Sequence, residues 1–142
     1  MIILGFSVYN VLVKGVSPID ELQGYKTNIE YGRSITDYTV KVKSSVANIK
    51  AAAESKKTDG SAINIIKTES ANLNKYESEA LQLKHTKKLD GFHTQYCNYL
   101  KTVADSAEGV TKVTNIGDGK NMTGVMDKLN YSFNQLINLS TK

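Results

Sequence analysis

Apolar residues recur every three or four positions along most of this chain, and this spacing constrains the fold more than any other feature of the sequence. Such spacing places side chains on one face of an α-helix, whereas a strand alternates every second residue. The only proline is Pro18, so no later proline interrupts the repeats. The chain is therefore predicted to be all-α.

A first helix is predicted to begin at Ser17, because serine can cap a helix and Pro18 suits its first position. A stop follows over residues 56–61, which contain Gly60, and a second helix comes after it. The predicted inward positions are Ile19, Leu22, Tyr25, Ile29, Ile35, Tyr38, Val42, Val46, Ile49 and Ala53 in the first helix, and Ala62, Ile66, Leu73, Tyr76, Ala80 and Leu83 in the second.

The apolar stripe changes phase over residues 85–91, where Gly91 permits either a kink or a reversal of the chain. A reversal predicts four helices in an up-and-down antiparallel bundle, and a kink predicts three, with residues 61–113 as one bent central helix. We favour four. The predicted inward positions after the break are Leu89, Phe92, Tyr96, Leu100 or Tyr99, Val103, Ala107 and Val110, then Met122, Val125, Met126, Leu129, Phe133, Leu136 and Ile137 beyond a turn at 115–119.

The chain has 142 residues, which is enough for one core of ordinary size, so residues 17–142 are predicted to form a single domain. Residues 1–16 form an apolar segment with no charge before Lys14. The segment is shorter than the roughly 20 residues that span a bilayer, and no basic residue precedes it as in a signal peptide. We expect a membrane anchor or the remnant of one. The alternative is an apolar helix packed on the bundle.

The net charge of +4 comes from 18 Lys and Arg residues that are dispersed along the chain, and Arg33 is the only arginine. A nucleic-acid-binding protein usually gathers such residues on one face, so no nucleic-acid partner is expected. The single cysteine, Cys97, cannot form an internal disulfide. The fold must therefore be stabilised by its apolar core.

Two residues with metal-binding or catalytic chemistry, His93 and Cys97, lie four positions apart and would share a helical face. His85 is the only other histidine, and two or three such residues do not complete a structural zinc site. Residues 117–121 lack phosphate-loop spacing, and no nucleophile-elbow motif occurs. No catalytic, cofactor or metal site and no small-molecule substrate are expected.

Tyrosines at positions 25, 31 and 38 are spaced six and seven residues apart along the first predicted helix. We predict Tyr25, Tyr31 and Tyr38 as partner-contact residues, with packing at the core boundary as the alternative. Residues 83–100 and the final amphipathic helix resemble small exported or membrane-anchored helical proteins of Gram-positive bacteria.

These observations favour a non-enzymatic, membrane-tethered or exported bundle that acts through protein or envelope contacts. Residues 1–16 would attach it to the membrane, and we expect the bundle on the extracytoplasmic side. The alternative function is a soluble, self-associating binding or regulatory bundle with residues 1–16 packed in its core.

Overall fold

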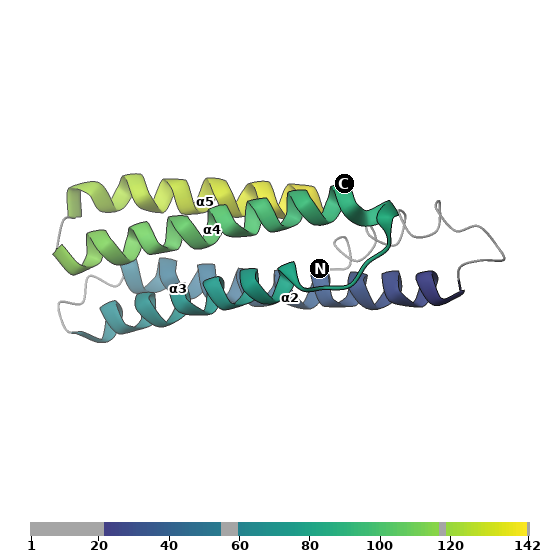
Figure 1. The fold of residues 1–142 in the computed structure, drawn as a ribbon. Coiled ribbons are helices and arrows are strands. Elements are labelled where there is room, and N and C mark those ends of the chain that lie inside the picture. The colour runs from purple at the N-terminus through teal and green to yellow at the C-terminus, as the bar shows by residue number, and fades with distance from the viewer. Residues whose placement is uncertain (1–21, 55–59, 117–118, 142) are drawn as a thin grey trace.

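Four long helices alternate in direction along a common axis in the computed structural model, which describes residues 22–54, 60–116 and 119–141 (Figure 1). They are α2 (Leu22–Glu54), α3 (Gly60–Leu81), α4 (Asp90–Ile116) and α5 (Gly119–Thr141), with a 3₁₀ turn, η1 (Lys87–Leu89), before α4. No strand occurs within the described ranges. The predicted all-α, up-and-down, four-helix bundle is confirmed.

The helices form two antiparallel hairpins that lie one on the other (Figure 1). α2 pairs with α3 in one layer and α4 pairs with α5 in the other, and α3 packs closely on α4 to join the layers. α2 also touches α5, along a smaller part of their lengths. Residues 82–89, here called the connection, pass from one hairpin to the other at one end of the bundle.

The reversal between α3 and α4 excludes the alternative of one kinked helix over residues 61–113. α3 ends in a tightened turn, in which the backbone N–H of Gln82 donates to the Glu79 carbonyl at 3.1 Å. Thr86 then takes an extended conformation, with φ −83° and ψ 168°, which no α-helix can continue through. Asp90 opens α4, where a negative charge suits the helix N-terminus.

The predicted apolar stripes form the core where the four helices meet. Among the positions that differ, Ala52 is buried where Ala53 was expected, and Tyr31, between the expected Ile29 and Ile35, is only 1% exposed. Tyr31 is buried because the connection lies over it. The other fully buried apolar residues are Ile35, Val42, Val46, Ile49, Ile66, Leu73, Ala80, Leu89, Tyr96, Leu100, Val103, Ala104, Ala107, Val110, Leu129 and Leu136.

The described helices are amphipathic, and a continuous apolar stretch of membrane-spanning length is found in none of them. The apolar segment 1–16 and the predicted domain boundary at residue 17 lie outside the described residues. The predicted start of the first helix at Ser17 also lies outside them, and the described part of α2 begins at Leu22.

The core predicts a large cost for truncating Leu100, which lies on α4 and is fully buried. Leu100→Ala should lower the free energy of unfolding by about 2–5 kcal/mol, because the cavity adds to the lost apolar transfer. Leu81→Ala is the matched control, since Leu81 is 48% exposed at the end of α3 and should cost about 0.5 kcal/mol or less. Urea denaturation measures both values, and equal costs would contradict this account of the core.

Candidate functional site

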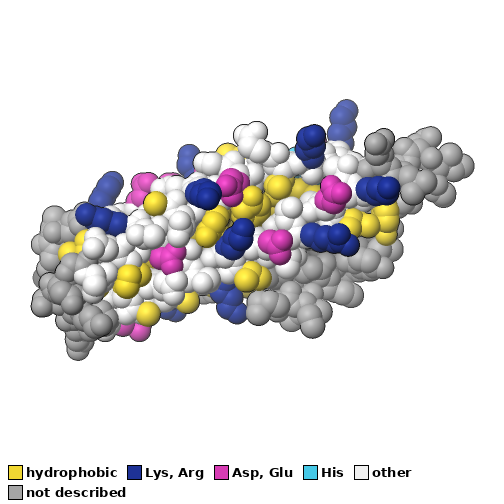
Figure 2. Space-filling model, turned by 90° about the horizontal axis from the view of Figure 1, so that it is seen from below, with side chains coloured by type: hydrophobic (Ala, Val, Ile, Leu, Met, Phe, Trp, Pro, Cys, Tyr) yellow, Lys and Arg dark blue, Asp and Glu magenta, His cyan; other side chains and the backbone are white. Residues whose placement is uncertain are grey.

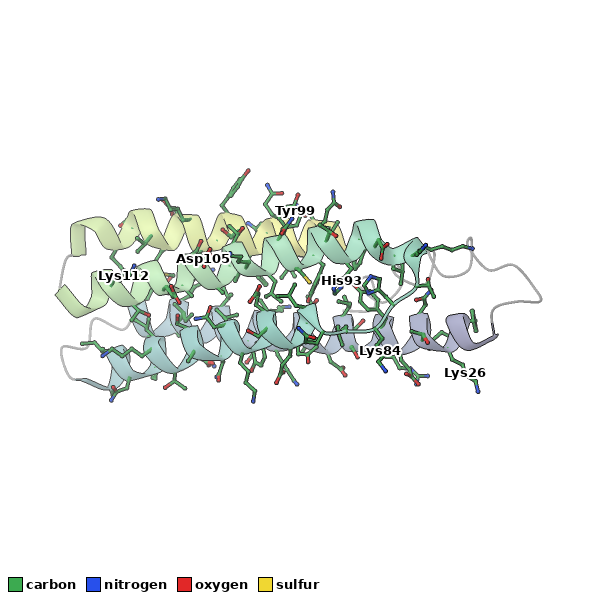
Figure 3. The ribbon with its side chains drawn as sticks, in the orientation of Figure 1. Lys26, Lys84, His93, Tyr99, Asp105 and Lys112 are labelled. Atoms are coloured by element: carbon green, nitrogen blue, oxygen red, sulfur yellow. The ribbon has the colours of Figure 1, made fainter. Side chains whose placement is uncertain are left out.

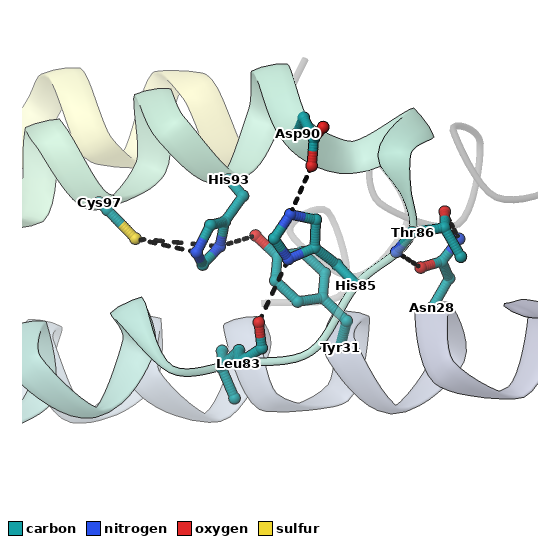
Figure 4. A network of polar contacts seen from close by, with 8 residues as sticks. All are labelled: Asn28, Tyr31, Leu83, His85, Thr86, Asp90, His93 and Cys97. Atoms are coloured by element: carbon teal, nitrogen blue, oxygen red, sulfur yellow. Dashed lines mark hydrogen bonds and ion pairs between the residues drawn. The ribbon is translucent and has the colours of Figure 1, made fainter.

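One buried amide side chain holds the connection against α2 (Figure 4). Asn28 Nδ2 donates to Thr86 Oγ1 at 2.7 Å, and the Thr86 backbone N–H donates to Asn28 Oδ1 at 3.0 Å. Because Asn28 is buried, these two bonds replace water at both ends of its amide. They also occupy a backbone N–H that lies outside any helix.

Tyr31 lies beneath the connection and links it to both layers (Figure 4). Its ring centroid is 5.4 Å from that of His85, 5.5 Å from that of His93 and 6.3 Å from that of Phe92. The Tyr31 hydroxyl lies 2.9 Å from His93 Nδ1. Burial raises the pKa of Tyr31 far above its ordinary value, so the hydroxyl keeps its proton.

His85 in the connection has an acceptor at each ring nitrogen. Nδ1 lies 3.2 Å from the Leu83 carbonyl oxygen, and Nε2 lies 2.9 Å from Asp90 Oδ1. Neither a carbonyl nor a carboxylate can donate, so only a doubly protonated ring satisfies both contacts. Both contacts are satisfied together only when His85 is doubly protonated, and in that state Asp90 at the start of α4 is its counter-ion.

His93 on α4 is held between Tyr31 and His85. The two imidazole centroids are 4.3 Å apart, with their planes inclined by 34°. Burial lowers the pKa of His93 and the neighbouring His85 lowers it further, against opposing effects of the Leu81 backbone and Asp90. A neutral His93 accepts the hydrogen bond of the Tyr31 hydroxyl at Nδ1. Tyr31, His85, Asp90 and His93 are called the histidine cluster below.

Cys97 lies one turn after His93, on the face that their spacing predicts. Its Sγ is 3.9 Å from Nδ1 and 3.7 Å from Nε2 of His93, so it is not aligned with one ring nitrogen. Burial, with a contribution from Glu77, raises the pKa of Cys97 to about 11. Roughly one thiol in ten thousand is then ionised at pH 7, so the pair lacks the thiolate that a cysteine nucleophile needs.

The described side chains offer no three converging His, Cys, Asp or Glu residues that could hold a metal ion. The histidine cluster supplies two imidazoles, of which His85 already faces an acceptor at both nitrogens. In Figure 3, His93 lies between the layers, whereas Lys26 extends away from the bundle. The cluster is therefore arranged to join segments of this chain.

A second region lies on the outer seam between α2 and α3, where paired side chains become smaller along the bundle. Successive pairs are seven residues apart on each helix, as in an antiparallel heptad repeat. The seam opens into a groove of about 660 Å³ where the pairs are smallest, on the face that Figure 2 shows. The pairs are Tyr38 with Tyr76, Ser45 with Glu69, and Ala52 with Ala62.

At the end of this seam where the paired side chains are largest, polar groups lie beside the aromatic rings. The Tyr38 and Tyr76 ring centroids are 6.2 Å apart, and Lys41 Nζ lies 5.5 and 5.9 Å from them. The Tyr38 hydroxyl donates to Glu79 at 3.3 Å. The tyrosines thus contact each other and charged neighbours while their edges remain accessible to solvent.

Glu69 borders the groove, which we call the α2–α3 groove. Burial acts to raise the pKa of Glu69, but hydrogen bonds from Asn48, Asn72 and Ser45 outweigh it and lower the pKa. The carboxylate therefore stays ionised and satisfied at neutral pH. Its hydrogen bonds join α2 to α3 beside the small residues that leave the groove open.

The chain matches no protein-family model, no curated protein and no solved structure. The histidine cluster and the α2–α3 groove are therefore interpreted from their own geometry.

The three tyrosines predicted as partner-contact residues do not share one exposed stripe. Tyr31 belongs to the core, whereas Tyr25 and Tyr38 are half-buried. A partner could reach the Tyr31 ring only if the connection moved. Partner contact through Tyr25 and Tyr38 stays a prediction.

Sequence reasoning identified His93 and Cys97 as neighbours but missed the roles of Asn28 and Thr86. The bond between those two residues joins positions 58 apart in the sequence. An asparagine within an otherwise helical pattern was the available signal, because a buried amide must find partners. Its partner could not be identified without the position of the connection.

The paired bonds of Asn28 predict a measurable contribution to stability. Asn28→Ala should lower the free energy of unfolding by about 1–3 kcal/mol, because the Thr86 N–H loses its acceptor. Asn98→Ala, at an exposed position on α4, is the control and should change it by about 0.5 kcal/mol or less. Equal effects in chemical denaturation would argue against the role assigned to Asn28.

Proposed function

We propose that this protein is a non-enzymatic helical bundle that is held at a membrane by residues 1–16 and acts through protein or envelope contacts. The observation that carries the proposal is an apolar segment with no charge before Lys14, joined to a bundle whose own helices are amphipathic. An apolar segment requires an apolar environment, and the described helices already form a core without residues 1–16. A bilayer surface or interior provides one.

The chemistry of the described helices agrees with a binding role. The two histidines are engaged with Tyr31, Asp90 and main-chain carbonyls, and the thiol of Cys97 is protonated at neutral pH. Such groups stabilise a structure more readily than they activate a substrate. The extracytoplasmic location remains part of the proposal.

Removing residues 1–16 separates tethering from packing. If these residues are a tether, the deletion should abolish sedimentation with membranes and flotation with vesicles while leaving the unfolding transition unchanged. If they pack on the core, the deletion should lower the free energy of unfolding. Fractionation and circular dichroism of the same protein distinguish the two, and a full-length chain that does not bind membranes would sink the tethering proposal.

A pair of point substitutions provides a milder version of this experiment. Leu4→Lys with Leu12→Lys should weaken membrane association, because each adds a charge to the apolar segment. Asn10→Gln in the same segment keeps its polarity and should leave membrane association unchanged.

The second candidate function is self-association of a soluble bundle through the α2–α3 face. Ile65 lines the groove and is 44% exposed, and Figure 2 shows apolar side chains along the middle of this face between charged ones. Small side chains allow another helix to approach closely. A second copy of the chain would then bury Ile65 in the groove region.

Substitution of Ile65 tests this candidate. Ile65→Glu should convert a dimer to a monomer in light scattering, because a charge would enter the interface. Leu81→Glu is the control, since Leu81 is equally exposed on α3 but does not line the groove. A wild-type chain that is monomeric across the concentrations measured would exclude this function.

A further inference from the structure

The histidine cluster lies where the two hairpins are joined, and each segment contributes to it. Tyr31 comes from α2, His85 from the connection, and His93 from α4 (Figure 4). The cluster is therefore placed to hold the connection on α2 and α4 together. It contains His93, and histidine is the side-chain type whose charge ordinarily changes near neutral pH.

Protonation of His93 would disturb two contacts at once. The two rings, whose centroids are 4.3 Å apart, would then place a charge on His93 next to His85, which already opposes that charge. Nδ1 would become a donor, so the Tyr31 hydroxyl would have to accept from it and its own proton would lose its acceptor. The repulsion between the two rings favours separation of the connection, which carries His85, from α4.

The groups around His93 do not fully offset the positive charge that it would gain on protonation. From α2, Tyr31 faces His93 and keeps its own proton; from α4, Asp90 is already paired with His85, and Cys97 is a neutral thiol. From α3, Leu81 contributes a backbone group, while Glu77 influences Cys97. On α5, the only titratable side chain from residue 129 to residue 141 is a tyrosine.

We propose that the histidine cluster is an acid-sensitive clasp, which holds the connection on α2 at neutral pH and releases it when His93 gains a proton. Release would expose Tyr31 and the neighbouring Phe92, which are covered or half-buried in the closed bundle. The exposure of this aromatic surface, at one end of the bundle, would then depend on the pH of the surroundings.

The direction of the pH dependence follows from the lowered pKa of His93. A released or unfolded His93, with the ordinary pKa near 6.5, binds a proton more readily than the clasped one. The closed clasp is therefore fully favoured above about pH 6.5, and its stability falls as the pH drops through that value toward the lowered pKa. The Glu69 pKa is lowered from 4.5, so measurements at pH 5.0 and above leave that carboxylate ionised.

Amide hydrogen exchange at Thr86 tests the clasp directly, because its N–H is bonded to Asn28. After correction for intrinsic exchange rates, protection of Thr86 should fall at least about tenfold between pH 7.5 and pH 5.0. The Val42 to Ile49 part of α2, far from the cluster, should keep its protection. Unchanged protection of Thr86 across this range would overturn the proposal.

Two variants assign the effect to the histidines. His93→Gln keeps an acceptor for the Tyr31 hydroxyl but cannot be protonated, so Thr86 protection should become independent of pH. His85→Gln removes the adjacent positive charge, so the midpoint for loss of protection and the NMR titration of the His93 ring should both move to higher pH. Retained pH dependence in His93→Gln, or no shift in His85→Gln, would contradict the clasp, and the second result decides if the first variant does not fold.

Discussion

A short line of hydrogen-bonded side chains between α2 and α4 determines how the two hairpins fit together. Thr39 on α2 donates to the Ile35 carbonyl at 2.7 Å, so the hydroxyl of Tyr96 on α4 donates to Thr39 across 2.8 Å. Thr39 and Tyr96 are both buried. Apolar stripes alone allow one helix to slide along another at little cost in free energy. A buried hydroxyl that loses its partner lowers the stability of the fold. The register that pairs them also places Tyr31 beside His93.

The two ends of the bundle differ in what lies against α2. At one end the connection crosses between the layers and is held by Asn28 and the histidine cluster. Toward the other end, the side chains paired across the α2–α3 seam become as small as Ala52 and Ala62, and a groove opens between the helices. Every buried side-chain nitrogen and oxygen among the described residues has a hydrogen-bond partner. The polar groups thus specify the arrangement, while apolar burial provides most of the driving force.

Periodicity was sufficient to predict the helices and most of the core, since positions such as Ile66, Leu100 and Leu136 follow directly from spacings of three and four. It was not sufficient for Tyr31, because burial of that ring depends on a connection more than 50 residues away in the sequence. The phase change at 85–91 indicated a break, but the extended backbone at Thr86 was needed to distinguish reversal from kink. Contacts between distant elements depend on how each helix is rotated and on its register with its neighbours. The apolar stripe of a single helix does not determine either of these.

A double-mutant cycle on Thr39 and Tyr96 tests the register most directly. Thr39→Val leaves the buried Tyr96 hydroxyl without its acceptor, and Tyr96→Phe removes that hydroxyl. The combined variant should be destabilised less than the sum of the two single variants, by about 1 kcal/mol or more, because it leaves no unpaired group. Additive losses in the free energy of unfolding would show that the two hydroxyls do not meet and would contradict the arrangement of the hairpins.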